Sequence, residues 1–386
     1  ATNIVVKAGD EVSEKRHNHA VRFAFKSSQK KGVSDMLMLA QSELPVTVEQ
    51  LDQNGWLLNV ANGTIDLRTG RLREHRREDH LTKVCPVAFD PDADQTAWLK
   101  FLNDVFGEDQ EIIGFMQRLL GYSITGDVSE HVLPILHGDG ANGKSTLVGA
   151  INSTLGTDFA GIAPRSLLMA QKGERHPTEL ATLFGKRVMV ASETEDGGEL
   201  NEALIKQLTG GDRISARRCR EDFWEFDATH QLILCTNHKP TVKGTDHAIW
   251  RRLKLIPFNR RFEGDQIDPT MPEKLAAQKP GILRWLVDGA VQWQQDGLNE
   301  PDAVRIATAE YRTNEDILGQ FIEEHFNNDP DGEVKASTFY ADLREWCDQQ
   351  GHSFNRKAKT VTQLMQKRGY STRTSNGLIY CGLRRQ

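Results

Sequence analysis

Hydrophobic residues recur at two different spacings along the first third of the chain. Over residues 15–42, 98–106 and 112–120 the apolar side chains return every three or four positions, which is typical of amphipathic helices. Residues 56–72 instead hold short apolar runs separated by Asn-Gly and Thr-Gly pairs, which predict short strands joined by tight turns. Gly32 is the expected break in the first helical stretch. We predict a helical and small-strand N-terminal domain over residues 1–108.

The middle of the chain alternates apolar strands with helices. Short apolar runs at 132–136, 188–191, 232–237 and 253–258 predict buried strands, and helical patterns lie between several of them. Strands over 214–218 and 223–226 predict a hairpin with a charged tip. This alternation favours an α/β fold, which we place at residues 109–327.

The C-terminal residues change in composition. Residues 327–332 are polar and contain Pro and Gly, which predicts a linker. Two helices and an Asn-Gly hairpin then predict a winged helix over 335–386. This stretch holds ten Lys/Arg against three Asp/Glu, although the whole chain has a net charge of −6. A basic end on an acidic body predicts contact with phosphate, and the candidate DNA-binding residues are Arg356, Lys357, Lys359, Lys367 and Arg373.

Bulk properties exclude several classes of protein. Apolar residues make up 38% of the chain, and no run approaches the length of a membrane span. The five cysteines are scattered without a C-x-x-C pair, which argues against a zinc site or disulfide framework and for a reducing cytosol. The first residue is Ala1, which fits either removal of Met or a fragment of a longer polypeptide.

A phosphate-binding loop is the strongest local motif. Residues 138–145 read G-x-x-x-x-G-K-S, after an apolar strand and before a helix, which is the context that a P-loop requires. Backbone N–H groups and the helix N-terminus would cradle a polyphosphate. Lys144 would reach the β- and γ-phosphates, and the Ser145 hydroxyl would hold Mg²⁺. The predicted nucleotide-binding residues are Gly138, Asp139, Gly140, Ala141, Asn142, Gly143, Lys144, Ser145 and Thr146.

Polar residues after the later strands complete a candidate ATPase site. Glu193 and Glu195 follow an apolar strand, as an acid that serves Mg²⁺ and the attacking water would do. One would position water and the other would support the metal shell with Ser192; their roles stay open. Asn237 ends the next strand and could orient water against the γ-phosphate. An arginine at 251 or 252 could stabilise charge on the transferring phosphoryl group.

Taken together, these motifs resemble the superfamily 3 helicase module of phage and plasmid primase-helicases, a group related to the poxvirus primase-helicase. The likeness rests on the phosphate loop and, more specifically, on Lys206-Gln207-Leu208-Thr209-Gly210-Gly211-Asp212, on Thr236-Asn237 and on Trp250-Arg251-Arg252. Residues 62–70 and 120–127 match the region that leads into the family core.

The resemblance implies an AAA+-like core that assembles as a ring, expected to be a hexamer, with ATP between subunits. It implies that Arg252, or else Arg251, acts on the neighbouring subunit's ATP. Arg217, Arg218 and Arg220 of the hairpin would grip DNA in the channel, and Lys206 would support the channel or the nucleotide. The implied activity is ATP-dependent unwinding of forked DNA, moving 3′ to 5′ on single strands in the cytoplasm of a bacterial host. A primase-polymerase domain is often fused upstream in this family.

Three other functions stay open on the residues alone. An AAA+ ATPase that remodels protein is disfavoured by the charged hairpin and the basic C-terminus. A DNA-binding initiator that uses nucleotide only to switch assembly would not need Glu193 or Asn237. A P-loop kinase would need an arginine-rich lid segment and would leave residues 209–212 unexplained.

Overall fold

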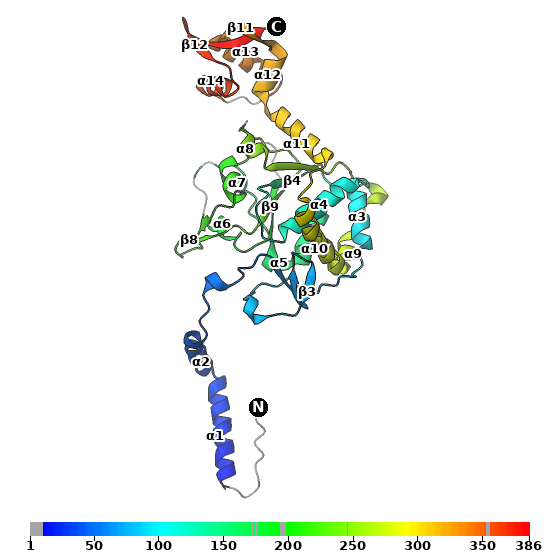
Figure 1. Ribbon diagram of the computed structural model, residues 1–386, viewed down its shortest axis with the longest axis vertical. Coiled ribbons are helices and arrows are strands. Elements are labelled where there is room, and N and C mark those ends of the chain that lie inside the picture. The colour runs from blue at the N-terminus through cyan, green and yellow to red at the C-terminus, as the bar shows by residue number, and fades with distance from the viewer. Residues whose placement is uncertain (1–10, 172, 174–176, 194–197, 245, 353–355) are drawn as a thin grey trace. The chain divides into compact units, whose positions relative to one another are not determined.

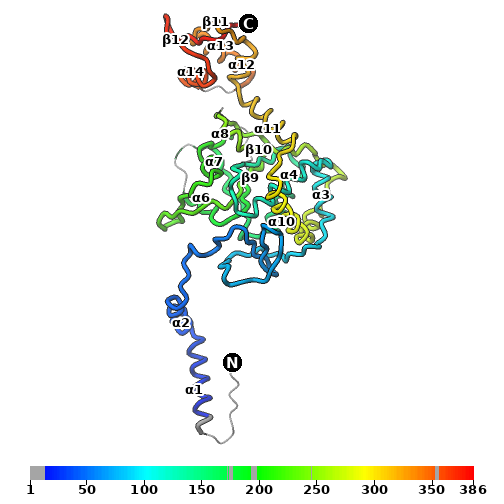
Figure 2. Tube along the Cα trace, viewed as in Figure 1, coloured from blue at the N-terminus to red at the C-terminus, as the bar shows by residue number. Residues whose placement is uncertain are grey.

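The chain consists of two compact units. A computed structural model describes residues 11–171, 173, 177–193, 198–244, 246–352 and 356–386, with only the backbone for residues 11–13 and Glu193. The first unit comprises residues 1–53 and 76–82, and the second comprises residues 54–75 and 83–386. Figures 1 and 2 trace the chain through both units. No helix in the described ranges is both long enough and apolar enough to cross a bilayer.

The first unit contains the helices α1 (Glu11–Ser28) and α2 (Lys30–Glu43). The break between them falls at Gln29, which is extended, so the prediction of a break at Gly32 is wrong. Gly32 lies inside α2, where a Cβ atom would lie 2.5 Å from the Lys26 carbonyl oxygen. The glycine therefore permits close approach of the two helices. The apolar positions of both helices are largely exposed, as Phe23 (67%) and Leu39 (70%) illustrate.

A five-stranded parallel sheet forms the centre of the second unit, with strand order β10-β4-β9-β6-β5. This confirms the predicted α/β class. The strands are β4 (Leu133–His137), β5 (Ala160–Ile162), β6 (Val188–Glu193), β9 (Gln231–Thr236) and β10 (Leu253–Pro257). Strand β9 lies between β4 and β6, so the strand before the glycine loop and the strand before the acids both neighbour it.

Helices cover both faces of this sheet. Successive strand residues point to opposite faces, so alternate residues enter two separate apolar cores. Val188 and Val190 join one core, and Met189 and Ala191 join the other. The first core is covered by α3 (Thr96–Phe106), α4 (Gln110–Ser123), α5 (Lys144–Phe159), α9 (Met271–Ala277) and α10 (Lys279–Asp296). The second receives residues of α7 (Glu202–Leu208), α8 (His247–Trp250) and α11 (Asp302–Glu315). The short helix α6 (Thr178–Ala181) packs partly buried residues against this second core.

Helices α4 and α10 cross at two glycines. A Cβ atom on Gly121 would lie 2.2 Å from the Ala290 nitrogen, and one on Gly289 would lie 2.1 Å from the Gln117 carbonyl oxygen. Larger residues would force the helix backbones apart. This explains why Gly121 occurs in the stretch that precedes the phosphate loop, since α4 must dock closely for the sheet to be covered.

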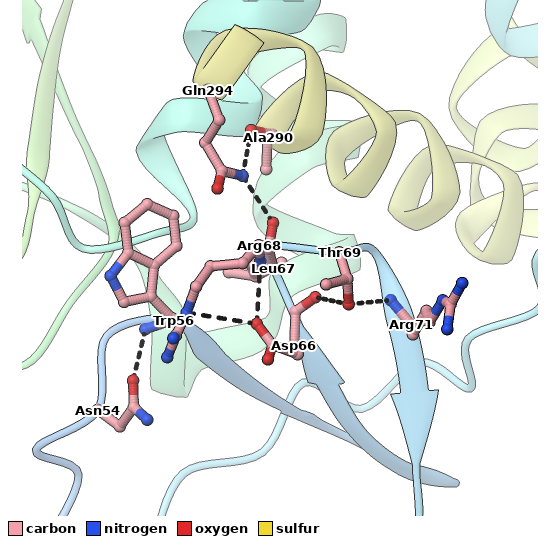
Figure 3. A network of polar contacts seen from close by, with 9 residues as sticks. All are labelled: Asn54, Trp56, Asp66, Leu67, Arg68, Thr69, Arg71, Ala290 and Gln294. Carbon is pink, nitrogen blue, oxygen red and sulfur yellow. Dashed lines mark hydrogen bonds and ion pairs between the residues drawn. The ribbon is translucent and has the colours of Figure 1, made fainter.

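A small antiparallel sheet, β1 (Leu57–Val60), β2 (Gly63–Asp66) and β3 (Arg71–Arg73), confirms the short strands predicted for residues 56–72. Figure 3 shows the turn between β2 and β3, where the Asp66 carboxylate accepts the Arg68 N–H at 3.0 Å and lies 3.6 Å from its guanidinium. The Leu67 carbonyl accepts a hydrogen bond from the Gln294 amide of α10 at 2.9 Å. The turn is thereby joined to the helix that covers the main sheet.

The C-terminal part of the second unit has its own apolar core, which runs from Leu318 to Leu383. A three-stranded antiparallel sheet of order β11-β13-β12 packs with three helices. The elements are α12 (Ile317–His325), β11 (Phe326–Lys335), α13 (Ala336–Gln349), α14 (Ala358–Lys367), β12 (Thr372–Thr374) and β13 (Leu378–Arg385).

The prediction of a linker at residues 327–332 is wrong, because these residues belong to β11. The register of β11 against β13 shifts between Asn328 and Glu333, so the polar Pro- and Gly-containing stretch is an irregularity within a paired strand. Composition marked the irregularity correctly, but it could not show that the strand on either side is paired.

Candidate functional site

The glycine loop joins the end of β4 to the start of α5, as its spacing predicts. Gly143 has a φ of +86° and is the N-cap of α5, and a Cβ atom there would lie 2.6 Å from Val105 Cγ2. At Gly138 a Cβ atom would lie 2.4 Å from the Phe258 carbonyl oxygen. Glycine is therefore required at both ends of the loop for steric reasons. Between them Asp139, Gly140 and Ala141 are exposed.

The Lys144 ammonium group is held at the centre of this loop. It donates to the Gly138 carbonyl, to Asn142 Oδ1 at 3.2 Å and to Asn237 Oδ1 at 3.2 Å. Burial lowers the pKa of Lys144, while the neighbouring Cys235 and Asp139 act in the opposite direction. The structure thus brings the loop lysine and the asparagine that follows β9 into direct contact, although they are 93 residues apart.

The ends of three parallel strands lie in one row beside this lysine. His137 of β4 is opposite Thr236 of β9, and Thr236 is opposite Glu193 of β6. The loop, Asn237 and Glu193 therefore leave the sheet at the same edge, which is where ligands of parallel α/β sheets bind. For Glu193 only this backbone position is described, and Glu195 lies outside the described residues.

The groups around the loop suit a polyphosphate with a divalent cation. Ser145 is exposed on the first turn of α5, where its hydroxyl can act as an oxygen ligand, and Thr146 follows it in the same turn. The N-terminus of this 16-residue helix favours an anion. Burial, followed by the charges of Lys239 and Lys144, lowers the pKa of His137, which favours its uncharged form.

The two neighbouring arginines lie near the N-terminal end of β4, whereas the loop follows its C-terminal end. The Arg252 carbonyl accepts the N–H of Leu133, the first residue of β4, whereas the loop begins after the last residue, His137. At a rise of about 3.3 Å per residue, these ends of β4 are about 13 Å apart. Neither arginine is placed to act on a nucleotide in the loop of its own chain.

Arg251 and Arg252 differ in exposure. Arg252 is buried, with 8% of its surface exposed, and its guanidinium donates to Thr209 Oγ1 at 3.1 Å and to the Ala248 carbonyl at 2.7 Å. Arg251 is exposed, and among the described residues its guanidinium has no hydrogen bond or ion pair. It lines a hollow of about 520 Å³ between α8, β10 and α11, together with Arg305 and Arg312.

Lys206 and Thr209 lie with the arginines and not with the glycine loop. Lys206 pairs with Asp246 at 2.9 Å, and Asp246 caps the N-terminus of α8. Burial alone would raise the pKa of Asp246, but the hydrogen bonds from Lys206 and from the Ile249 N–H outweigh it and lower this pKa. The stretch from Lys206 to Asp212 therefore supports the helix that carries Arg251.

The predicted hairpin is present as β7 (Ile214–Ala216) and β8 (Trp224–Phe226). Arg217 lies 5.1 Å from the Phe223 ring, and Arg218 lies 5.8 Å from the Trp224 ring. Arg220 is exposed at the tip and has a φ of +64°, a left-handed conformation that non-glycine residues seldom adopt. Such a conformation is often retained for function.

The basic residues of the C-terminal part fall into two groups. Lys357, Lys359 and Lys367 are exposed at or along α14. Arg373 instead forms two hydrogen bonds with the Glu333 carboxylate, and Arg356 donates to the Lys243 carbonyl at 2.9 Å. Three of the five candidates are thus exposed, whereas two are engaged within the chain.

Sequence reasoning missed the buried partners that hold these groups. Thr209 was part of a recognised motif, but its hydrogen bond to Arg252 spans 43 residues and leaves no local pattern. Tyr311 and Glu315 of α11, which contact the segment after Asn237, belong to an ordinary helical stripe in the sequence. Only the packing of α11 on the sheet brings them there.

Comparison with known proteins adds two family matches. Residues 2–107 match the family described as D5 N terminal like, and residues 136–252 match a family of unknown function (DUF5906). A protein of Acanthamoeba polyphaga mimivirus named "Putative helicase" is 28% identical over 326 residues, covering 78% of this chain and 34% of its own. A protein of African swine fever virus named "Putative primase" is 25% identical over 342 residues, covering 80% and 35%. The chain spans about a third of the length of these relatives.

Solved structures of the NrS-1 C-terminal region are also similar to this chain. One has a TM-score of 0.47 at 16% identity and covers 62% of this chain and 55% of its own. Another, of residues 305–718 of that protein, has a TM-score of 0.46 at 14% identity and covers 78% of both chains.

Proposed function

Because this chain belongs to the family of viral and phage primase-helicases, we propose that it is the ATP-driven DNA helicase module of such a protein. Its core would be an AAA+-like P-loop ATPase, spanning about residues 109–315, that works in a ring of identical subunits. A primase-polymerase domain upstream would complete the natural protein. The substrates would be ATP and single-stranded or forked DNA.

One observation carries this proposal: the Lys144 ammonium lies 3.2 Å from Asn237 Oδ1 at the sheet edge where β6 ends in Glu193. A lysine and an amide in contact beside a glycine loop, with an acidic residue at the end of the neighbouring strand, are the residue types that nucleotide hydrolysis needs. A glycine-rich turn with an unrelated lysine would not require the asparagine or the aligned strand ends.

Each group has a distinct task in hydrolysis. Lys144 would leave the Gly138 and Asn237 oxygens for the phosphate oxygens and neutralise charge that develops there. Asn237 would then orient the attacking water, and one of Glu193 and Glu195 would accept its proton. The Ser145 hydroxyl and the other acid would hold Mg²⁺, which would supply charge neutralisation at the phosphates.

The position of the arginines supports action between subunits. Since they lie at the far edge of the sheet, an arginine can complete an ATP site only on a neighbouring copy of the chain. Arg251 is exposed and lines the hollow beside α11, whereas Arg252 is engaged with Thr209 and Ala248. We therefore assign the trans-acting role to Arg251, and a supporting role to Arg252, in place of the order expected from sequence.

DNA would be met by exposed cations from two elements. Arg220 at the hairpin tip would contact the backbone of a single strand in the ring channel, beside Arg217 and Arg218. The α14 lysines would contact phosphates from a winged helix formed by residues 317–386. Such contacts do not read sequence, and they weaken as the salt concentration rises.

The decisive test is the Lys144→Ala substitution. Without the ammonium group the γ-phosphate charge is uncompensated, so we expect ATP hydrolysis to fall to background in a steady-state assay with and without single-stranded DNA. Lys100→Ala is the matched control, because Lys100 is exposed and pairs with Asp104 one helical turn away. Hydrolysis by the Lys144→Ala protein at the wild-type rate would refute the assignment. Wild-type hydrolysis that ignores single-stranded DNA would favour a protein-remodelling ATPase.

A further inference from the structure

The segment that follows Asn237, residues 238–244, is named here the relay segment. It begins at the phosphate-loop edge of the sheet, where Asn237 contacts Lys144, and leads toward α8 and the arginines at the other edge. Its first turn is held by Thr236, whose Oγ1 accepts the His238 N–H at 3.1 Å and donates to the His238 carbonyl at 2.5 Å. A displacement of Asn237 would therefore be transmitted directly into this segment.

Helix α11 holds the middle of the relay segment through two side chains one helical turn apart. The Tyr311 hydroxyl donates to the Pro240 carbonyl, and the Val242 N–H donates to Glu315 Oε2 at 2.8 Å. Tyr311 is fully buried and packs edge-on against Trp250 at 5.2 Å. Glu315 is the last residue of α11 and directly precedes the C-terminal part of the chain.

The far end of the relay segment contacts the entrance to α14. The Lys243 carbonyl accepts a hydrogen bond from the Arg356 guanidinium at 2.9 Å, and the Arg356 carbonyl accepts the Tyr340 hydroxyl of α13 at 2.8 Å. Arg356 directly precedes Lys357, the N-cap of α14. A shift of the relay segment would thus act on the helix that bears the exposed lysines.

The same segment also touches the helix of the arginines. The Trp250 indole donates to the Gly244 carbonyl at 2.9 Å, and the Gly244 N–H donates to Glu202 Oε1 of α7 at 2.5 Å. Trp250 precedes Arg251. The relay segment therefore contacts α11, the residue that precedes the N-cap of α14 and the helix α8, and it begins directly after Asn237 of the proposed nucleotide site.

We infer that the relay segment couples the nucleotide state to DNA binding by the C-terminal part, with Glu315 and Arg356 as positioning residues. This rests on the proposed function. When Lys144 turns from Asn237 to a γ-phosphate, Asn237 is released, and the hydrogen bonds to Glu315 and Arg356 carry that change to α11 and α14. Linkage then requires the reverse effect, so bound DNA must change nucleotide affinity by the same factor.

The test measures the coupling factor in the full chain, which is the ratio of DNA affinities with and without bound nucleotide. The affinity for a fluorescent oligothymidylate is titrated with and without a slowly hydrolysed ATP analogue, and the analogue affinity is titrated with and without the oligonucleotide. Coupling between two sites is typically about 5–150-fold. We expect Glu315→Ala and Arg356→Ala each to bring this factor close to one, and the double substitution to lower it no further.

Controls separate coupling from folding and from simple contact. Glu310→Ala on the exposed face of α11 and Arg344→Ala on α13 remove the same charges, and both should keep the wild-type factor. Glu315→Gln retains an acceptor for the Val242 N–H and should restore most of the coupling. Thermal unfolding of every variant reports whether the fold is intact.

Two results from the variants would overturn the inference. One is an unchanged factor in both single variants; the other is a loss of DNA affinity in Arg356→Ala that is equal with and without the analogue, since that marks a plain DNA contact. A wild-type protein that hydrolyses ATP and binds DNA without any coupling would overturn it as well. A wild-type protein that does neither would instead refute the proposed function.

Discussion

Two adjacent arginines show how sharply the roles of single residues can differ. Arg252 directly precedes β10, and its guanidinium donates to Thr209, whereas Arg251 follows the last residue of α8 and is exposed. An arginine with the trans-acting role must extend out of its own subunit. A guanidinium that donates to two internal acceptors would first have to lose those hydrogen bonds. The exposed residue is therefore the better candidate, although the motif as a string of letters favoured its neighbour.

This assignment predicts opposite outcomes for the two alanine variants. Arg251→Ala should lower ATP turnover by about 10³-fold, with unchanged nucleotide affinity and thermal stability, because only transition-state charge is left uncompensated. Arg252→Ala should destabilise the fold by about 1.5–3 kcal/mol, because a buried charged donor and its partners lose their hydrogen bonds. Steady-state kinetics and denaturant unfolding of both variants check this. A stable but inactive Arg252→Ala protein would reverse the two roles.

At the scale of elements, the C-terminal sheet begins before residue 335, where the sequence predicted the winged helix to begin. Strand β11 starts at Phe326 and pairs with β13, and α12 contributes Phe321 to the same core. A truncation at residue 335 would therefore leave β11 without its partner and expose apolar surface. Effects of such a truncation on DNA binding would be mixed with unfolding, so point substitutions on α14 give the cleaner test.

We expect the combined variant Lys357→Gln, Lys359→Gln, Lys367→Gln to bind single-stranded DNA more weakly while basal ATP hydrolysis is kept. If all three lysines meet phosphates, the slope of log affinity against log salt should fall by up to about 2. Fluorescence anisotropy across a salt series measures this slope. The matched control replaces Arg373, Arg384 and Arg385 with Gln, since each already pairs with an acid. Equal slopes for the two triple variants would contradict a specific role for α14.

At the scale of the whole molecule, the sheet separates the two halves of the proposed active site. The glycine loop, Asn237 and Glu193 lie at the C-terminal ends of the parallel strands, and Arg251 lies near the N-terminal end of β4. In the proposed assembly, a single chain would hold half of each of two ATP sites, and the adjacent copies would supply the other halves. The proposed ring of subunits arranged head to tail would satisfy this geometry, because each interface of such a ring joins two different surfaces of the chain.

Mixing two inactive proteins tests this arrangement. Lys144→Ala lacks a working loop and Arg251→Ala lacks the arginine, so a loop from the second protein beside an arginine from the first should be active. In a random equal mixture about a quarter of the interfaces have this combination, so about a quarter of wild-type ATP turnover should return. Each protein mixed with buffer is the control. No recovery, with mixed assembly verified by cross-linking, would contradict action across an interface.

The amino-acid sequence by itself determined the features that depend on short stretches of chain. These are the glycine loop between strand and helix, the buried strands that lead to Glu193 and Asn237, the charged hairpin and the α/β class. They could be predicted because backbone geometry, side-chain periodicity and turn chemistry act over a few residues. The helix break at Gln29 and the pairing of β11 were not predicted. Close packing of the two helices decided the position of the break, and the distant strand β13 decided the pairing.

Only the tertiary structure decided which long-range partners each functional residue has. The contact between Lys144 and Asn237, the burial of Arg252 against Thr209, and the links from Val242 to Glu315 and from Lys243 to Arg356 join residues 93, 43, 73 and 113 positions apart. Such contacts depend on how the helices dock on the two faces of the sheet, and no local pattern encodes them. The residue types of the site are thus readable from the sequence, whereas their division between two edges of one sheet is a property of the fold.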